Sequence, residues 1–283
     1  MKSFSLSLLV IIVSTTFSIQ VRASDDLVLN TKGGLYIHEL KDYDLSSSVF
    51  LDNQRLLAIR HKDKNFLIYG IPYDSELGEN SLEIKINNDI RRLDFNIKPK
   101  FFDTQKIRIS SKYSNLSLAS QERVVFESNH LKQAKDYWYN IFPDLKFTIP
   151  ANGIVTGRFG TKRFYNGKAG NPHNGLDIGA EKGTKIMAPS AGKIILTGHY
   201  YYNGKFILLD HGMGLKSIFI HLDEILVEKG QLVKKGELIG KIGNTGKSSG
   251  PHLHWSLILN KTYIDPEYFL NGQIIDYFSL KVE

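Results

Sequence analysis

The chain has 283 residues, enough for one large or two modest domains, and it contains no cysteine. The lack of cysteine excludes disulfides, a thiolate nucleophile, cysteine-ligated zinc and a lipidated N-terminal cysteine. The formal charge of +7 suits an anionic polymer such as a cell wall, but no basic run is dense enough to predict nucleic-acid binding.

Residues 1–23 have the features of a secretory signal. Lys2 supplies the positive start, and the apolar run 4–13 is too short to span a bilayer. We predict cleavage after Ala23, with an uncleaved N-terminal anchor as the alternative. Removing Lys2 and Arg22 leaves 34 of the 36 basic residues against 29 acidic ones, a net charge of +5. No later segment is apolar enough to cross a membrane, so we expect an exported protein of a bacterial cell envelope.

Residues 24–111 contain short β-branched or aromatic runs separated by Gly, Asn, Asp and Pro. The runs are 34–37, 56–59, 66–69 and 82–86. This spacing predicts a small β-sandwich-like N-terminal domain. His38 and His61 stand alone in it and are interpreted as surface or core residues rather than as ligands.

Residues 112–146 change to a helical period and are predicted to form a helical linker. The helix runs from residue 116 to about residue 139, with Ser117 or Ser120 as its N-cap and with Val125 and Phe126 on its apolar positions. We expect this helix to separate two β domains. The alternative is a helix that packs only on its own domain.

Residues 147–283 are rich in glycine, which marks turns between short strands. Strands are predicted at 193–196, 206–209 and 217–220, and two more turn within 230–240. No helical pattern alternates with them, which argues against βαβ units. The chain is therefore predicted to be mainly β, with an antiparallel C-terminal sheet.

Two short strings in this C-terminal part carry metal-binding groups: His173 with Asp177, and His252 with His254. Residues two apart on a strand share a face, so His252 and His254 can both reach one ion, or one can stand beside it. The Asn174-Gly175 turn is expected to fold His173 back towards Asp177. With His221, the set has four imidazoles and one carboxylate, so three can bind a metal and two remain for acid/base chemistry. Such ligands suit zinc.

An ordered series of motifs accompanies these residues and identifies a family resemblance. Over about residues 147–270, the chain resembles the lysostaphin-type zinc metallopeptidases, which cut the peptide part of bacterial cell walls. The N-terminal β region resembles a Gram-negative subgroup more loosely. The matching positions are 157–160, 171–178, 188–189, 192, 210–212, 220–222, 243–246 and 250–255.

The resemblance assigns each of these five residues to metal binding or to catalysis, which their spacing alone does not. It implies that His173, Asp177 and His254 bind one Zn²⁺ per chain and that His221 and His252 are the catalytic histidines. It also implies a periplasmic endopeptidase acting on peptidoglycan stem peptides, at the D-alanyl–diaminopimelate cross-link. The alternative is a catalytically silent wall-binding protein or an activator of a cell-wall amidase, against which the five intact residues argue.

Two further rivals are an exported zinc peptidase acting on proteins or on a competitor's wall, and an envelope protein with a purely structural zinc. Lys247 stands where the family usually has Arg, and Gly179 stands where many members have Ala. The division of labour between His221 and His252 and the oligomeric state stay open.

Several flanking residues receive weaker predictions. Arg158 and Arg163 are expected either to meet substrate carboxylates or to form surface ion pairs. The Tyr200–Tyr202 run is predicted to form a groove wall, and His211 to shape a turn. The two-domain layout predicts that the N-terminal region covers the groove until the wall or an envelope regulatory protein displaces it.

Overall fold

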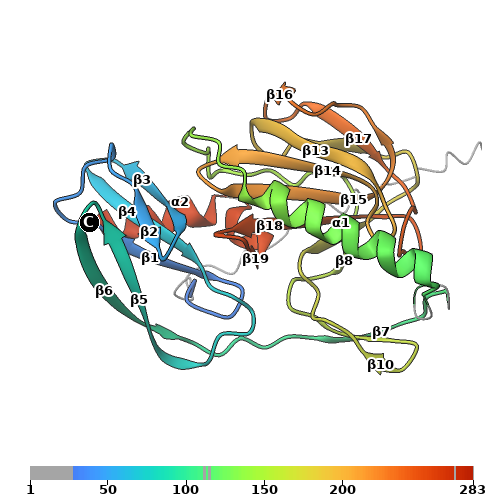
Figure 1. Cartoon of the computed structure of the whole chain (residues 1–283), viewed down its shortest axis with the longest axis horizontal. Helices are drawn as coiled ribbons and strands as arrows, with labels where there is room; N and C mark the ends of the chain where they lie inside the picture. Colours follow the sequence, from blue (N-terminus) through green and yellow to red (C-terminus); the bar gives the residue numbers. More distant parts are fainter. Residues whose placement is uncertain (1–27, 111–112, 114–115, 271, 283) are drawn as a thin grey trace, which may run out of the picture.

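The computed structural model describes residues 28–110, 113, 116–270 and 272–282 (Figure 1). The predicted signal, residues 1–23, lies outside the described residues. Two β regions make up most of the molecule, one at each end of Figure 1, and a long helix runs along the C-terminal one. The mainly β prediction is confirmed.

The N-terminal region is a six-stranded antiparallel sheet with strand order β1-β4-β3-β2-β5-β6. Leu82, Ile84 and Ile86 are buried while the residues between them are exposed, the alternation of a sheet with one covered face. The rings of Tyr36 and Phe95 stack with centroids 4.2 Å apart, although they lie on opposite edge strands. The sheet therefore curls around one core. The strands are β1 (Leu35–Glu39), β2 (Val49–Leu51), β3 (Gln54–His61), β4 (Lys64–Gly70), β5 (Gly78–Ile86) and β6 (Asp89–Ile97).

Strand β7 (Thr104–Ile107), which the sequence did not predict, precedes the predicted linker, and we extend the name linker to residues 104–146. This strand pairs in parallel with β9 (Lys162–Tyr165), and β9 pairs with β10 (Lys168–Ala169). These strands form a separate three-stranded sheet at the lower right of Figure 1. The linker thus adds a strand to the C-terminal region.

Helix α1 (Leu118–Asp136) has Ser117 as its N-cap, as predicted, with the Ser117 side chain accepting the Ser120 N–H. Its apolar period marks a covered face only towards its C-terminal end, where Leu131 and Ala134 pack against an apolar cluster of the C-terminal sheet, whereas Val125 and Phe126 are 60% and 70% exposed. The buried Glu127 also accepts the backbone N–H of Tyr201 at 2.7 Å. The expectation that this helix separates two β domains is wrong, since it lies along the C-terminal sheet beside β13.

The C-terminal region is a ten-stranded sheet in which every pairing is antiparallel, as predicted. Its main path has the order β16-β13-β14-β15-β18-β11-β8, while β12, β17 and β19 pair beside it. Its strands are β8 (Ile154–Gly157), β11 (Leu176–Gly179), β12 (Lys185–Met187), β13 (Gly192–Tyr200), β14 (Gly204–Gly212), β15 (Leu215–Ile225), β16 (Leu232–Val233), β17 (Leu238–Ile242), β18 (His252–Leu259) and β19 (Thr262–Ile264).

The two β regions contact each other directly. A 3₁₀ helix, η2 (Pro266–Phe269), leads towards α2 (Gln273–Val282), whose Phe278 ring lies 5.0 Å from the Phe66 ring of β4. The Asn260 amide donates to the Gly70 carbonyl at 3.0 Å and accepts the Gly70 N–H at 2.6 Å. One buried apolar cluster includes residues of both regions. Over the described residues, neither helix is long and apolar enough to cross a bilayer.

Candidate metal centre and active site

Strand order places the predicted site residues side by side. β18 lies between β15 and β11, so His254 pairs with Ile220 on one side and with Asp177 on the other. Ile220 directly precedes His221, and His252 is two residues before His254. Three neighbouring strands therefore supply four of the five predicted side chains.

The fifth side chain, His173, comes from the turn before β11, as predicted. Its Nδ1–H donates to the Arg158 carbonyl at 2.8 Å, and this leaves Nε2 directed at Asp177. Gly175 makes the turn possible, because a Cβ there would lie 2.5 Å from the Trp255 carbonyl oxygen. No larger residue fits between the turn and β18 without displacing backbone.

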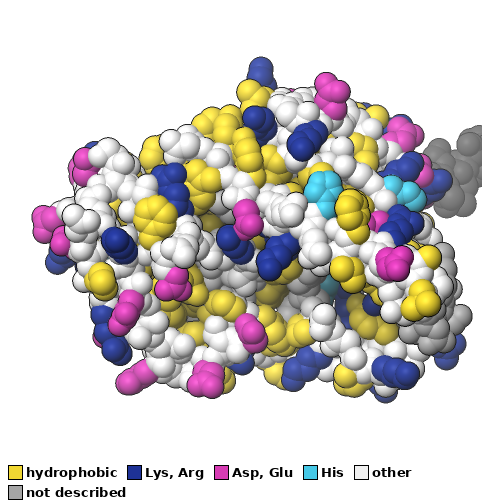
Figure 2. Space-filling view, in the orientation of Figure 1, with side chains coloured by type: hydrophobic (Ala, Val, Ile, Leu, Met, Phe, Trp, Pro, Cys, Tyr) yellow, Lys and Arg dark blue, Asp and Glu magenta, His cyan; other side chains and the backbone are white. Residues whose placement is uncertain are grey.

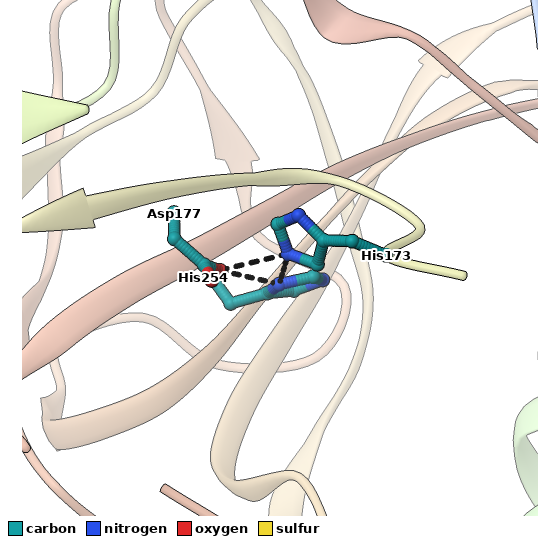
Figure 3. A group of neighbouring side chains, drawn as sticks. All are labelled: His173, Asp177 and His254. Atoms are coloured by element: carbon teal, nitrogen blue, oxygen red, sulfur yellow. Dashed lines mark hydrogen bonds and ion pairs between the residues drawn. The ribbon is translucent and has the colours of Figure 1, made fainter. Parts of the chain in front are cut away.

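His173, Asp177 and His254 form a buried triad (Figure 3). Asp177 Oδ1 lies 3.0 Å from His173 Nε2 and 2.8 Å from His254 Nδ1, and these two nitrogens are 2.9 Å apart. The three atoms come from a turn and two adjacent strands and face one point. We call these three residues the ligand triad.

The ligand triad fits a zinc ion by its donor set and its tautomers. His254 Nε2 lies 2.7 Å from Ser256 Oγ, which leaves Nδ1 as the metal-facing nitrogen. Donors about 2.0–2.1 Å from a tetrahedral zinc lie about 3.3 Å apart, so small side-chain rotations admit the ion. Three such ligands would leave one open position on a tetrahedral ion, as in catalytic rather than closed structural sites.

The electrostatics of the triad also favour a cation. Burial by itself would raise the pKa of Asp177, but the neighbouring imidazoles of His173 and His254 lower this pKa well below its ordinary value. Burial lowers the pKa of His254 to about 4. At neutral pH the triad therefore holds an ionised carboxylate and a neutral His254 imidazole, the forms that bind metal without first losing a proton.

His221 and His252, which we call the histidine pair, lie beside the triad with ring centroids 4.8 Å apart. His221 Nδ1–H donates to the Thr245 carbonyl, and His252 Nδ1–H to the Gly250 carbonyl, both at 2.8 Å. These bonds leave both Nε2 atoms for a substrate or water. His252 Nε2 is 3.8 Å from Asp177 Oδ1, so the pair borders the metal position.

His221 adopts a backbone conformation that is uncommon for a residue with a side chain. Its φ is +69°, and its N–H donates to the Asn203 carbonyl at 2.9 Å. Burial, followed by the charges of His252 and His254, lowers the pKa of His221 to about 3. The ring is therefore neutral near pH 7.

The two arginines differ in role. Arg158 forms an ion pair with Glu267, in agreement with the surface-pair alternative. Arg163 does neither of the things expected from the sequence, because its guanidinium contacts Asp177 and its side chain is only 11% exposed.

The linker and the loop before β18 meet near this site. The Tyr113 phenol donates to the Gly246 carbonyl, and the Tyr113 ring lies 5.6 Å from that of Tyr201. The Lys247 ammonium lies 3.8 Å from the centre of the Tyr165 ring. Basic and acidic side chains are interspersed over the face drawn in Figure 2, so the positive net charge is not gathered into one patch there.

Comparisons with known proteins place this site in a family. Residues 171–266, which contain all five site residues, match Peptidase family M23. A Pseudomonas aeruginosa protein assigned to peptidase M23, known from its crystal structure, is 30% identical with a TM-score of 0.71. The similarity covers 85% of this chain and 94% of that one. The chain belongs to peptidase family M23.

Curated relatives share mainly this C-terminal part. The peptidoglycan DD-endopeptidase ShyA of Vibrio cholerae is 34% identical over 115 residues, which are 40% of this chain and 27% of ShyA. An uncharacterized metalloprotease of Buchnera aphidicola is 28% identical over 86% of this chain and 53% of its own length. The chain thus spans about a quarter of ShyA and about half of the Buchnera protein.

Proposed function

We propose that this chain is a zinc-dependent endopeptidase that hydrolyses the peptide cross-links of bacterial peptidoglycan. The observation that carries the proposal is the division of five polar side chains into a convergent ligand triad and an adjacent histidine pair whose Nδ1 atoms bond to backbone carbonyls, which leaves their Nε2 atoms for substrate or water. Family M23 membership and the names of the ShyA-type relatives support the substrate class. The D-alanyl–diaminopimelate bond is the proposed bond cleaved.

The chain's own residues then divide the chemistry. When bound to His173, Asp177 and His254, zinc supplies Lewis acidity that polarises the scissile carbonyl and lowers the pKa of water. One member of the histidine pair takes the proton from the attacking water. One or both then stabilise the tetrahedral oxyanion or protonate the leaving amine. The neutral ring of His221 near pH 7 suits these roles.

We propose the periplasm or cell envelope of a Gram-negative bacterium as the location. The sequence of residues 1–23 and the mature charge of +5 support export and attraction to an anionic wall. A protein in this location would meet its proposed substrate, the stem peptides of peptidoglycan. An envelope regulatory protein remains a proposed partner, on the two-domain layout alone.

The test is digestion of purified Gram-negative peptidoglycan, with and without a zinc chelator, followed by mass analysis of the fragments. We expect chelator-sensitive conversion of cross-linked dimers to monomers, with fragment masses that identify the bond. His199→Ala is the matched control, because His199 is exposed. Zinc bound at one equivalent without any conversion would favour the wall-binding or amidase-activating alternative.

A further inference from the structure

The two oxygens of Asp177 have different partners. Oδ1 contacts His173 Nε2 and His254 Nδ1, whereas Oδ2 accepts a hydrogen bond from the Arg163 guanidinium. The Asp177 and Arg163 side chains are only 8% and 11% exposed. A buried, charge-assisted bond of this kind fixes the rotation of the carboxylate, so one oxygen faces the metal position and the other faces away.

Gly157 provides the space for this contact. It is the direct register partner of Asp177 in the pairing of β8 with β11. A Cβ at residue 157 would lie 2.7 Å from Arg163 Nη2 and 3.0 Å from Asp177 Oδ2. Any side chain there would push the guanidinium off the carboxylate, so β8 accommodates Arg163 through a glycine.

The linker holds the other side of the same guanidinium. Arg163 Nε–H donates to Gln105 Oε1 at 3.2 Å, and the two residues are register partners in the parallel pairing of β7 with β9. Two hydrogen bonds therefore connect the linker strand to a metal ligand, from Gln105 to Arg163 and from Arg163 to Asp177.

We propose that Arg163 is a positioning residue for the metal centre, holding Asp177 as a one-oxygen ligand, and that Gln105 orients Arg163 from the linker. The inference rests on the ligand triad of the proposed function. It gives strand β7 a supporting role at the site. It also assigns Arg163 to the metal ligand rather than to substrate recognition.

The positive charge of Arg163 has an effect on zinc affinity opposite to that of positioning Asp177, and the test must separate the two effects. A guanidinium near the site repels a bound cation, so its removal would strengthen zinc binding if charge dominated. If positioning dominates, both Arg163→Gln, which removes the charge, and Arg163→Lys, which keeps it, weaken binding. Loss of an outer-shell partner typically costs about 10–100-fold in metal affinity.

The experiment is a zinc titration of each full-length variant against a chromophoric chelator. We expect at least about tenfold weaker zinc binding for both Arg163 variants and a smaller loss for Gln105→Ala. Gln105→Ala should add little in the Arg163→Lys background, because the two residues act in one chain of bonds. Arg92→Gln is the matched control, since Arg92 pairs with Asp94 on the exposed face of the N-terminal sheet, and its zinc affinity should not change.

A spectroscopic measurement separates positioning from a general loss of structure. We expect the visible absorption of the cobalt-substituted protein to change in Arg163→Lys and to stay unchanged in Arg92→Gln, because Asp177 coordination is altered only in the former. Zinc binding by Arg163→Gln that equals or exceeds that of the unaltered protein would overturn the proposal. Zinc affinity does not depend on peptidoglycan cleavage, so failure of the proposed function would appear separately.

Discussion

The ligand triad and the histidine pair lie next to each other. They differ in which ring nitrogen is hydrogen-bonded to the protein and which is left for a ligand. His254 contacts Ser256 through Nε2 and presents Nδ1, whereas His252, two residues earlier on β18, donates Nδ1–H to Gly250 and presents Nε2. Their spacing along the strand places both on one face and does not distinguish them. Their hydrogen bonds direct one towards the metal position and the other beside it.

Removing a triad member should have the largest effect. In His173→Ala, a three-ligand site becomes a two-ligand site, and the buried Asp177 loses one of the bonds that favour its ionised form. We expect zinc to be absent after dialysis and peptidoglycan cleavage to fall to background. Metal analysis and a muropeptide assay check this, with His199→Ala as control. One equivalent of zinc retained by His173→Ala would remove His173 from the ligand set.

Removing a member of the histidine pair should separate chemistry from metal binding. His221→Ala and His252→Ala should each keep one equivalent of zinc, because neither side chain belongs to the ligand triad. We expect the cleavage rate to fall about 10²–10⁴-fold, the usual contribution of a general acid or base. The double variant tests whether the pair acts as a unit, in which case the losses do not multiply.

Loss of zinc in either His221→Ala or His252→Ala would show that the residue is a metal ligand and does not belong to the histidine pair. Near-native rates in both variants would remove the pair from the mechanism altogether.

His211 provides a third class of histidine, in which the protein occupies both ring nitrogens. Nδ1 is 2.8 Å from the Ala191 carbonyl oxygen and Nε2 is 2.7 Å from Ser217 Oγ, in agreement with the predicted structural role. Burial lowers its pKa to about 4, from 6.5 for an unperturbed histidine. Between these values the unfolded chain binds a proton that the folded protein does not, so stability falls as pH falls below 6.5.

This difference gives a measurable pH dependence of stability. Between pH 7 and pH 5, the free energy of unfolding should fall by about 2 kcal/mol more in the unaltered protein than in His211→Gln. Denaturant unfolding at the two pH values measures this, and the subtraction cancels the other histidines. Equal slopes would mean that His211 does not carry the pH dependence. Zinc content should be the same in both proteins.

The sequence predicted the parts of the molecule that local chemistry determines. Glycine-bounded β-branched runs gave the C-terminal strands, and the cap at Ser117 gave the start of α1. Strand alternation placed His252 and His254 on one face, and the Asn174-Gly175 turn brought His173 to Asp177. These are interactions between residues close in sequence or on one regular element.

The sequence did not predict the contacts between distant segments. The sequence of residues 104–107 does not indicate that they pair with β9, because the pairing depends on a partner about 58 positions later in the chain. Helical period alone suggested apolar contacts at Val125 and Phe126, which are exposed, whereas α1 is held by Leu131 and Ala134 and by the Glu127 carboxylate, which accepts the backbone N–H of Tyr201. The placement of Arg163 on Asp177 required both strand pairings at once.

The smallest expected effect concerns access to the site and should leave both groups of histidines intact. The predicted restraint by the N-terminal region is best tested at Tyr113, since truncation near Phe147 would uncover the buried cluster shared by the two β regions. Tyr113 connects the linker to Gly246 in the loop before β18 through a hydrogen bond.

One such hydrogen bond contributes about 1 kcal/mol, which corresponds to about fivefold in an equilibrium between closed and open forms of the site. We therefore expect Tyr113→Phe, which loses this bond and keeps the ring near Tyr201, to raise kcat/KM for peptidoglycan up to about fivefold with unchanged zinc content. Tyr113→Ala, which also loses the ring contact with Tyr201, should raise it further. An unchanged or lower rate in Tyr113→Ala would show that this contact supports the site rather than restraining it, as we infer for Gln105.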